Sequence, residues 1–137
     1  MPVLRRVGIL IVVALLVFGL AGTLAIAKKK KKKKTHHWPS QVTVTHPTET
    51  QFVGVASSKL DACRSSRVIG LYYTDPNTGQ TQPLSVQRTD GNGRYQVDLP
   101  KPAYAGTYQV QLIARKIRAM KAPQICNGAQ SPVLTVF

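Results

Sequence analysis

Two cysteines and three histidines are the residues of this 137-residue chain best suited to covalent or metal chemistry. A nucleophilic thiol needs a base such as histidine beside it, but His36, His37 and His46 all precede both cysteines. Cys63 and Cys126 instead have the polar neighbours of strand-joining loops. Two such cysteines pair readily in an oxidising compartment. We therefore predict a Cys63–Cys126 disulfide rather than a catalytic thiol.

The histidines and carboxylates do not form a recognisable reactive motif. His36 and His37 are adjacent, so their side chains point apart, and no cysteine or acidic residue nearby completes a metal-ligand set. Glu49 is the one glutamate, and the chain lacks a clustered carboxylate pair, a nucleophile elbow and a phosphate-binding loop. We predict that the protein is not an enzyme and has no metal site and no cofactor.

The N-terminal segment has the layout of an export signal. A cationic start is followed by an apolar run from Val7, and small residues at Ala25 and Ala27 have cleavage spacing. This pattern predicts a signal peptide over residues 1–27 and a secreted or cell-envelope protein. An uncleaved membrane anchor through residues 7–27 stays open, because that uncharged stretch is long enough to span a bilayer and the lysines after it favour the cytoplasmic side.

Half of the net charge of +14 lies in one lysine run. Adjacent like charges repel one another, so residues 28–40 are predicted to be a disordered, lysine-rich linker. Its role is either that of a solvated spacer or that of an electrostatic tether to an anionic cell-envelope polymer or lipid surface. Export argues against nucleic acid as the partner. The polyanion-binding candidates are Lys28, Lys29, Lys30, Lys31, Lys32, Lys33 and Lys34.

Residues 41–137 are the right length for one domain and read as short strands. Val42 and Val44 alternate with polar neighbours, and Phe52 and Val55 lie in a second run. Turn residues separate five further runs, at 68–73, 83–88, 94–99, 107–115 and 132–137. Seven strands at this spacing predict an all-β sandwich. In the sixth run, Tyr108, Val110, Leu112 and Ala114 are predicted to face the core.

Two connections carry further predictions. Residues 90–93, Asp-Gly-Asn-Gly, predict a hairpin turn between the fourth and fifth strands, whereas a calcium loop would place Arg94 at a ligand position. The run 107–115 reads as a strand that continues into a basic loop up to Lys121, and residues 113–120 read alternatively as an amphipathic basic helix. This segment is a candidate docking loop for another exported protein, through Arg115, Lys116, Arg118 and Lys121.

The fifth and sixth runs carry a resemblance to a known family. Thr89-Asp90-Gly91-Asn92-Gly93-Arg94-Tyr95-Gln96-Val97-Asp98-Leu99-Pro100 followed by Gly106-Thr107-Tyr108-Gln109-Val110 resembles the carboxypeptidase regulatory-like and transthyretin-like domains. The segments Phe52-x-Gly54-Val55-x-Ser57, Cys63-x-x-x-Arg67-Val68 and Cys126-x-x-Ala129-x-Ser131 resemble exported bacterial versions with a cysteine pair.

This resemblance implies an immunoglobulin-like or prealbumin-like sandwich without catalytic residues of its own. The chain departs from the family pattern at residues 101–105, which lengthen a link that is usually short. Two functions remain open at this stage. One is a non-catalytic binding or structural module of the cell envelope; the other is an accessory or inhibitory protein that docks an exported enzyme.

Overall fold

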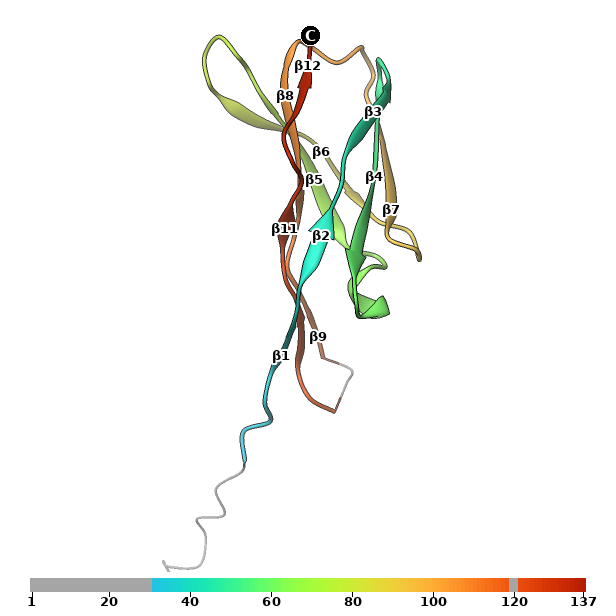
Figure 1. Ribbon diagram of the computed structural model, residues 1–137, viewed down its shortest axis with the longest axis vertical. Helices are drawn as coiled ribbons and strands as arrows, with labels where there is room; N and C mark the ends of the chain where they lie inside the picture. Colours follow the sequence, from blue (N-terminus) through green and yellow to red (C-terminus); the bar gives the residue numbers. More distant parts are fainter. Residues whose placement is uncertain (1–30, 119–120) are drawn as a thin grey trace, which may run out of the picture. The chain divides into compact units, whose positions relative to one another are not determined.

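The computed structural model describes residues 31–118 and 121–137, which form an all-β structure with one short 3-10 helix (Figure 1). The chain divides into two units, Met1–Lys32 and Lys33–Phe137. The predicted signal or anchor segment, 1–27, lies outside the described residues, as do Lys28, Lys29 and Lys30. Within the part of the chain that is described, no helix has the length and apolar character needed to span a membrane.

The described residues contain twelve strands and the 3-10 helix η1. In chain order these elements are β1 (His36–Trp38), β2 (Ser40–Val42), β3 (Thr45–Thr48), β4 (Gln51–Ser58), η1 (Asp61–Cys63), β5 (Val68–Thr74), β6 (Thr81–Arg88), β7 (Arg94–Asp98), β8 (Gly106–Leu112), β9 (Arg115–Ile117), β10 (Gln124–Cys126), β11 (Ala129–Gln130) and β12 (Leu134–Val136).

One sheet has the order β11-β8-β5-β6, and β12 also pairs with β8. Successive side chains of a strand point to opposite faces, and the predicted core face of β8 is confirmed for Tyr108, Val110 and Leu112, which are buried. The fourth predicted core residue, Ala114, is exposed because the strand ends at Leu112. The alternating pattern therefore predicted both the strand and its buried face.

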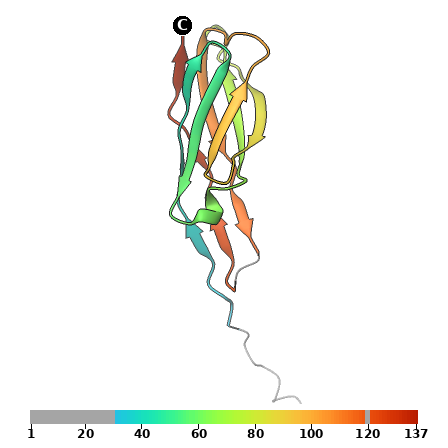
Figure 2. The ribbon, with the colours of Figure 1, turned by 90° about the vertical axis from the view of Figure 1, so that its right-hand side faces the viewer.

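A second sheet has the order β2-β4-β3, with β7 also paired to β4. Phe52 of β4 is buried opposite Val97 of β7. Its ring meets that of Tyr108 from the first sheet, with 4.7 Å between the centroids. The two sheets thus share one apolar core, as in a β-sandwich (Figure 2). The buried core residues are Val42, Phe52, Ala56, Ile69, Leu71, Tyr73, Tyr95, Val97, Tyr108, Val110 and Leu112.

The strands are more divided than the seven that the sequence predicted. The first predicted strand is broken at Thr43 and Val44 into β2 and β3, and the hydroxyl of Tyr95 donates a hydrogen bond to the Thr43 carbonyl at that break. The last predicted strand begins at Leu134, and the separate strand β11 precedes it. Both breaks lie in edge strands, which in the described part of the chain have hydrogen-bonded strand partners on one side only.

The turn at 90–93 forms, but it does not make a hairpin. The Asp90 carboxylate accepts hydrogen bonds from the backbone N–H groups of Asn92 and Arg94, each at 2.8 Å. Gly93 adopts a φ of 83°, which favours glycine. However, β6 and β7 pair with β5 and β4 and lie in different sheets, so the turn connects the two sheets and the hairpin prediction is wrong.

The third sheet, with the order β1-β10-β9, was not predicted. We call it the end sheet, because it extends past the other two sheets at the end opposite the C-terminus (Figures 1 and 2). The prediction of a disordered linker over 28–40 is wrong for His36–Trp38, which pair in parallel with β10, and for Ser40, which begins β2. The predicted strand 107–115 is interrupted after Leu112, and the prediction of a basic loop or a helix is wrong for Lys116 and Ile117, which form with Arg115 an antiparallel strand beside β10.

Candidate functional site

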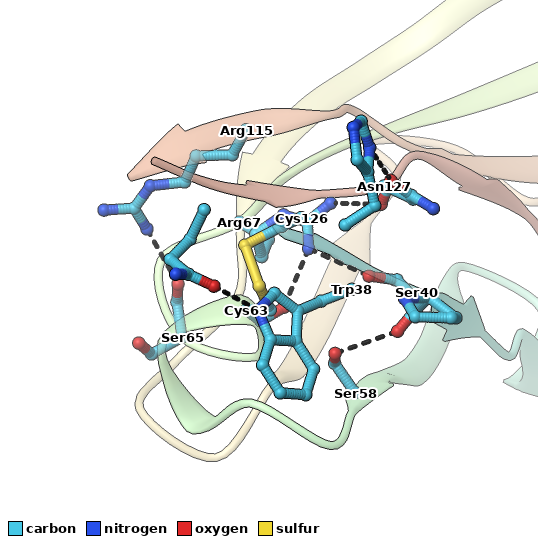
Figure 3. The surroundings of a disulfide bond; sticks show 12 residues. Trp38, Ser40, Ser58, Cys63, Ser65, Arg67, Arg115, Cys126 and Asn127 are labelled. Carbon is cyan, nitrogen blue, oxygen red and sulfur yellow. Dashed lines mark hydrogen bonds between the residues drawn. A yellow bond between two sulfur atoms is a disulfide. The ribbon is translucent and has the colours of Figure 1, made fainter. Parts of the chain in front are cut away.

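The predicted disulfide is confirmed. Cys63 and Cys126 are bonded, with their Cα atoms 5.3 Å apart, and both are fully buried. The bond joins the end of η1 to the end of β10 (Figure 3). In the neighbouring strand β1, Trp38 is the ladder partner of Cys126. The indole N–H of Trp38 donates a hydrogen bond to the side-chain oxygen of Gln124 in β10. The disulfide therefore fixes the central strand of the end sheet.

A buried arginine lies next to this disulfide (Figure 3). Nη1 of Arg67 donates to the Cys63 carbonyl at 2.8 Å and to the Ser40 hydroxyl at 3.2 Å. Nη2 donates to the carbonyls of Ile113 and Asn127, both at 2.8 Å. The side chain is 0% exposed. Nε has no hydrogen-bond partner among the described residues.

These acceptors lie where the three strands of the end sheet join the rest of the domain. Ser40 follows β1, Ile113 precedes β9, and Asn127 follows β10. One guanidinium thus bonds to a residue next to each strand of the end sheet, and the disulfide also fixes the central strand, β10. This role of Arg67 was not predicted from the sequence. The available signal was an arginine directly before the apolar run 68–73, within a few residues of a cysteine.

The charge of Arg67 is balanced by dipoles rather than by an acid. In the described residues the one ion pair joins Arg64 to Asp61. Burial lowers the pKa of the Arg67 guanidinium, and the positive charge of Arg115 lowers that pKa further. An arginine side chain nevertheless stays protonated in a protein. The three carbonyl groups and the hydroxyl therefore solvate a full positive charge inside the fold.

The predicted docking residues all lie on or beside β9 and are exposed. Arg115 is in register with Cys126, whereas Lys116 is in register with Ile125, so the two side chains project from opposite faces of the sheet. Nη1 of Arg115 donates to the Ser65 carbonyl at 3.2 Å, next to η1 (Figure 3). Arg118 directly follows β9, and Lys121 precedes β10 by three residues.

The predicted lysine candidates are described in part. Lys31, Lys32, Lys33 and Lys34 are exposed and belong to no strand. Lys33 and Lys34 belong to the same unit as the strands and lie just before β1 in the chain. We call Lys33, Lys34, Arg115, Lys116, Arg118 and Lys121 the basic end. No acidic residue occurs in the sequence at 33–40 or at 113–128.

The remaining candidates for chemistry are dispersed. His46 packs on Phe52, with 4.4 Å between the ring centroids, in β3 and away from the two histidines of β1. Among the described residues there is no group of three histidines, cysteines or acids that could hold a metal ion. A shallow groove of about 760 Å³ runs over Val53, Val55 and Arg94. Its acid, Asp90, is engaged by the backbone of its own turn.

Fold and site together define a small all-β module with one disulfide and a uniformly basic end. No protein-family model, curated protein or solved structure matches this chain. The resemblance to carboxypeptidase regulatory-like and transthyretin-like domains therefore stays a prediction. The function has to be argued from the site itself.

Proposed function

We propose that the protein is an exported, non-catalytic module that binds an anionic component of the cell envelope, with residues 28–34 as its electrostatic tether. The observation that carries this proposal is the basic end. Its cations are exposed, and no acidic residue lies in the segments that form it. Within a Debye length of about 10 Å such charges reinforce one another, so the arrangement favours attraction of an extended anion over a purely structural use.

Export is supported by the disulfide, which is compatible with an extracellular location. It is also supported by the signal-like layout of residues 1–27 in the sequence. In this proposal the signal is cleaved after Ala27, so that the mature chain begins with the lysine run. The sandwich is immunoglobulin-like or prealbumin-like, as the motif at 89–100 implies.

The proposal is tested by replacing all seven lysines at 28–34 with glutamine in the producing cell. Each lysine near an anionic surface contributes about 1 kcal/mol at low salt, so the variant should move from the envelope fraction to the medium. Salt should release the unmodified protein in the same way. The matched control is Lys59→Gln with Lys101→Gln, two exposed lysines outside the basic end. Unchanged retention of the seven-lysine variant would reject the tether.

A second candidate function is docking to an exported enzyme through the segment 115–121. The observation that favours it is the position of β9 at the edge of the end sheet, where one side of the strand has no strand partner among the residues that the structure describes. Such a strand can pair with an extended segment of another protein. Crosslinking in culture supernatant separates the two functions, because a single enzyme partner lost on Lys116→Glu would favour docking.

A further inference from the structure

We infer that the partner of the basic end is a flexible linear anionic polymer, bound jointly by the end sheet and by the lysines that lead into β1. Inorganic polyphosphate is the simplest probe of this chemistry. The inference rests on the proposed function and narrows its partner from any anionic surface to one physical class. Three features of the end sheet support it.

The first feature is the placement of cations on both faces of a narrow sheet. Because Arg115 is in register with Cys126 and Trp38, it shares a face with the disulfide. Lys116, in register with Ile125 and His37, projects from the other face. A planar bilayer can contact only one of these faces at a time. A flexible polymer can pass around the strand edge and contact both.

The second feature is the state of the aromatic side chain. Trp38 is the only tryptophan, tyrosine or phenylalanine in the sequence at 33–40 and 113–128. Its indole N–H is bonded to Gln124 within the end sheet, and its strand is in register with the disulfide strand. Trp38 is half-buried, and its polar edge is used within the sheet rather than left to meet lipid headgroups, as the edge of a tryptophan at a bilayer surface does. The ligand-binding groups that the basic end presents are therefore mainly its cations, which suit phosphate groups.

The third feature is the link between β1 and β10. The N–H of His36 donates to the Pro123 carbonyl at 3.0 Å, and the N–H of Asn127 donates to the Trp38 carbonyl at 2.9 Å. Lys34 is two residues before His36 in the chain. The ladder thus keeps the C-terminal end of the lysine run two residues from β1, which lies in the same sheet as β9 and its cations. Binding of one polymer molecule at both places gains from effective concentration.

The charge requirement is tested on the full-length chain in a neutral detergent, by titration with long-chain polyphosphate at low salt. Lys116→Gln, Arg118→Gln and Lys121→Gln together should weaken binding about 100-fold, at about fivefold per cation. Lys33→Gln with Lys34→Gln should weaken it about 25-fold on the same basis. Lys59→Gln with Lys101→Gln is the matched control and should change the affinity less than about threefold. Equal losses in the control would overturn the assignment of the site.

The joint binding is tested by separating the two parts without removing charge. His36→Pro removes the N–H that bonds to Pro123, whereas His36→Ala removes the same imidazole and keeps that N–H. The proline variant should bind polyphosphate at least about tenfold more weakly than the alanine variant. Insertion of about ten glycine and serine residues between Lys34 and Thr35 leaves β1 intact and should also cost about tenfold. Unchanged affinity in both variants would overturn joint binding.

The polymer class is tested against a bilayer headgroup with the same protein. Mixed micelles of phosphatidylglycerol in the neutral detergent present phosphate without a flexible chain. Tighter binding of polyphosphate with no shift of the Trp38 emission supports the inference. Preferential binding of the lipid with a blue shift of that emission overturns the inference and leaves the proposed function standing. Binding of neither probe overturns both.

Discussion

The buried guanidinium of Arg67 gives the sharpest test of how the end sheet is held. Arg67→Met removes four charge-assisted hydrogen bonds while keeping a side chain of similar length. Such bonds contribute about 1.5–3 kcal/mol each, but the variant recovers the cost of burying a charge, which is several kcal/mol. The net loss of unfolding free energy is therefore about 3 kcal/mol, comparable to breaking a buried ion pair from one side.

Arg67→Lys separates the role of charge from that of shape. The four acceptors are shared between two nitrogens that point apart, so one ammonium cannot reach both pairs. Lysine still carries a buried charge, and it leaves carbonyl groups without a donor. We expect Arg67→Lys to be at least as destabilising as Arg67→Met. A lysine variant as stable as the unmodified protein would show that charge alone matters and would refute this reasoning.

Urea unfolding followed by circular dichroism measures both variants, with Arg88→Met as the control. Arg88 is exposed and donates one hydrogen bond, to the Ser66 carbonyl at 3.1 Å, so its loss should cost less than about 0.5 kcal/mol. For a domain of this size, 3 kcal/mol corresponds to about 15 °C in Tm. Hydrogen exchange should locate the damage: amides of β1, β9 and β10 should exchange faster, while those of β5 and β8 keep most of their protection.

Three further predictions concern stability. Replacing Cys63 and Cys126 with alanine should cost about 4 kcal/mol in urea unfolding, because the disulfide closes a loop with a sequence separation of 63; a loss below about 1 kcal/mol would contradict this. Hydrogen bonds from Gln51 and Gln96 lower the pKa of Asp98. The contribution of Asp98 to the free energy of unfolding is therefore present above the usual carboxyl pKa and is lost as the pH falls through the lowered pKa. Asp98→Asn should make the acid side of the curve of unfolding free energy against pH flatter. Gly54→Ala should cost about 3 kcal/mol in thermal unfolding, since a Cβ there would overlap the Thr43 carbonyl.

The sandwich strands were predictable because their signal is local. In β8 apolar and polar residues alternate over several positions, and that pattern specifies both the strand and its buried face. In β5 a short run of apolar and aromatic residues with high strand propensity indicates a buried strand. The connection after β6 was predicted only in part. The sequence 90–93 encodes a tight turn, yet whether the next strand pairs with β6 or crosses to the other sheet depends on contacts that the turn does not contain.

The end sheet was not predictable from local pattern. Strand β1 is three residues long and follows a run of lysines, and its ladder partner β10 is 88 positions later, from His36 to Gln124. Neither segment alternates over enough residues to indicate a strand. The disulfide was predicted, but what it fixes became visible only once β10 was seen to pair with both β1 and β9.

The way in which Arg67 is satisfied bears on the proposed function. A buried cation can be stabilised by an acidic partner. The two opposite charges then largely cancel one another's electric field outside the ion pair. Here carbonyl and hydroxyl dipoles perform that task, so the charge of Arg67 is solvated but not neutralised. Its field adds to that of Arg115, which is close enough to lower the Arg67 pKa. Arg67 therefore has two effects. It holds the end sheet in place, and its charge adds to the positive potential that the exposed cations produce at the basic end, where an anionic polymer would bind.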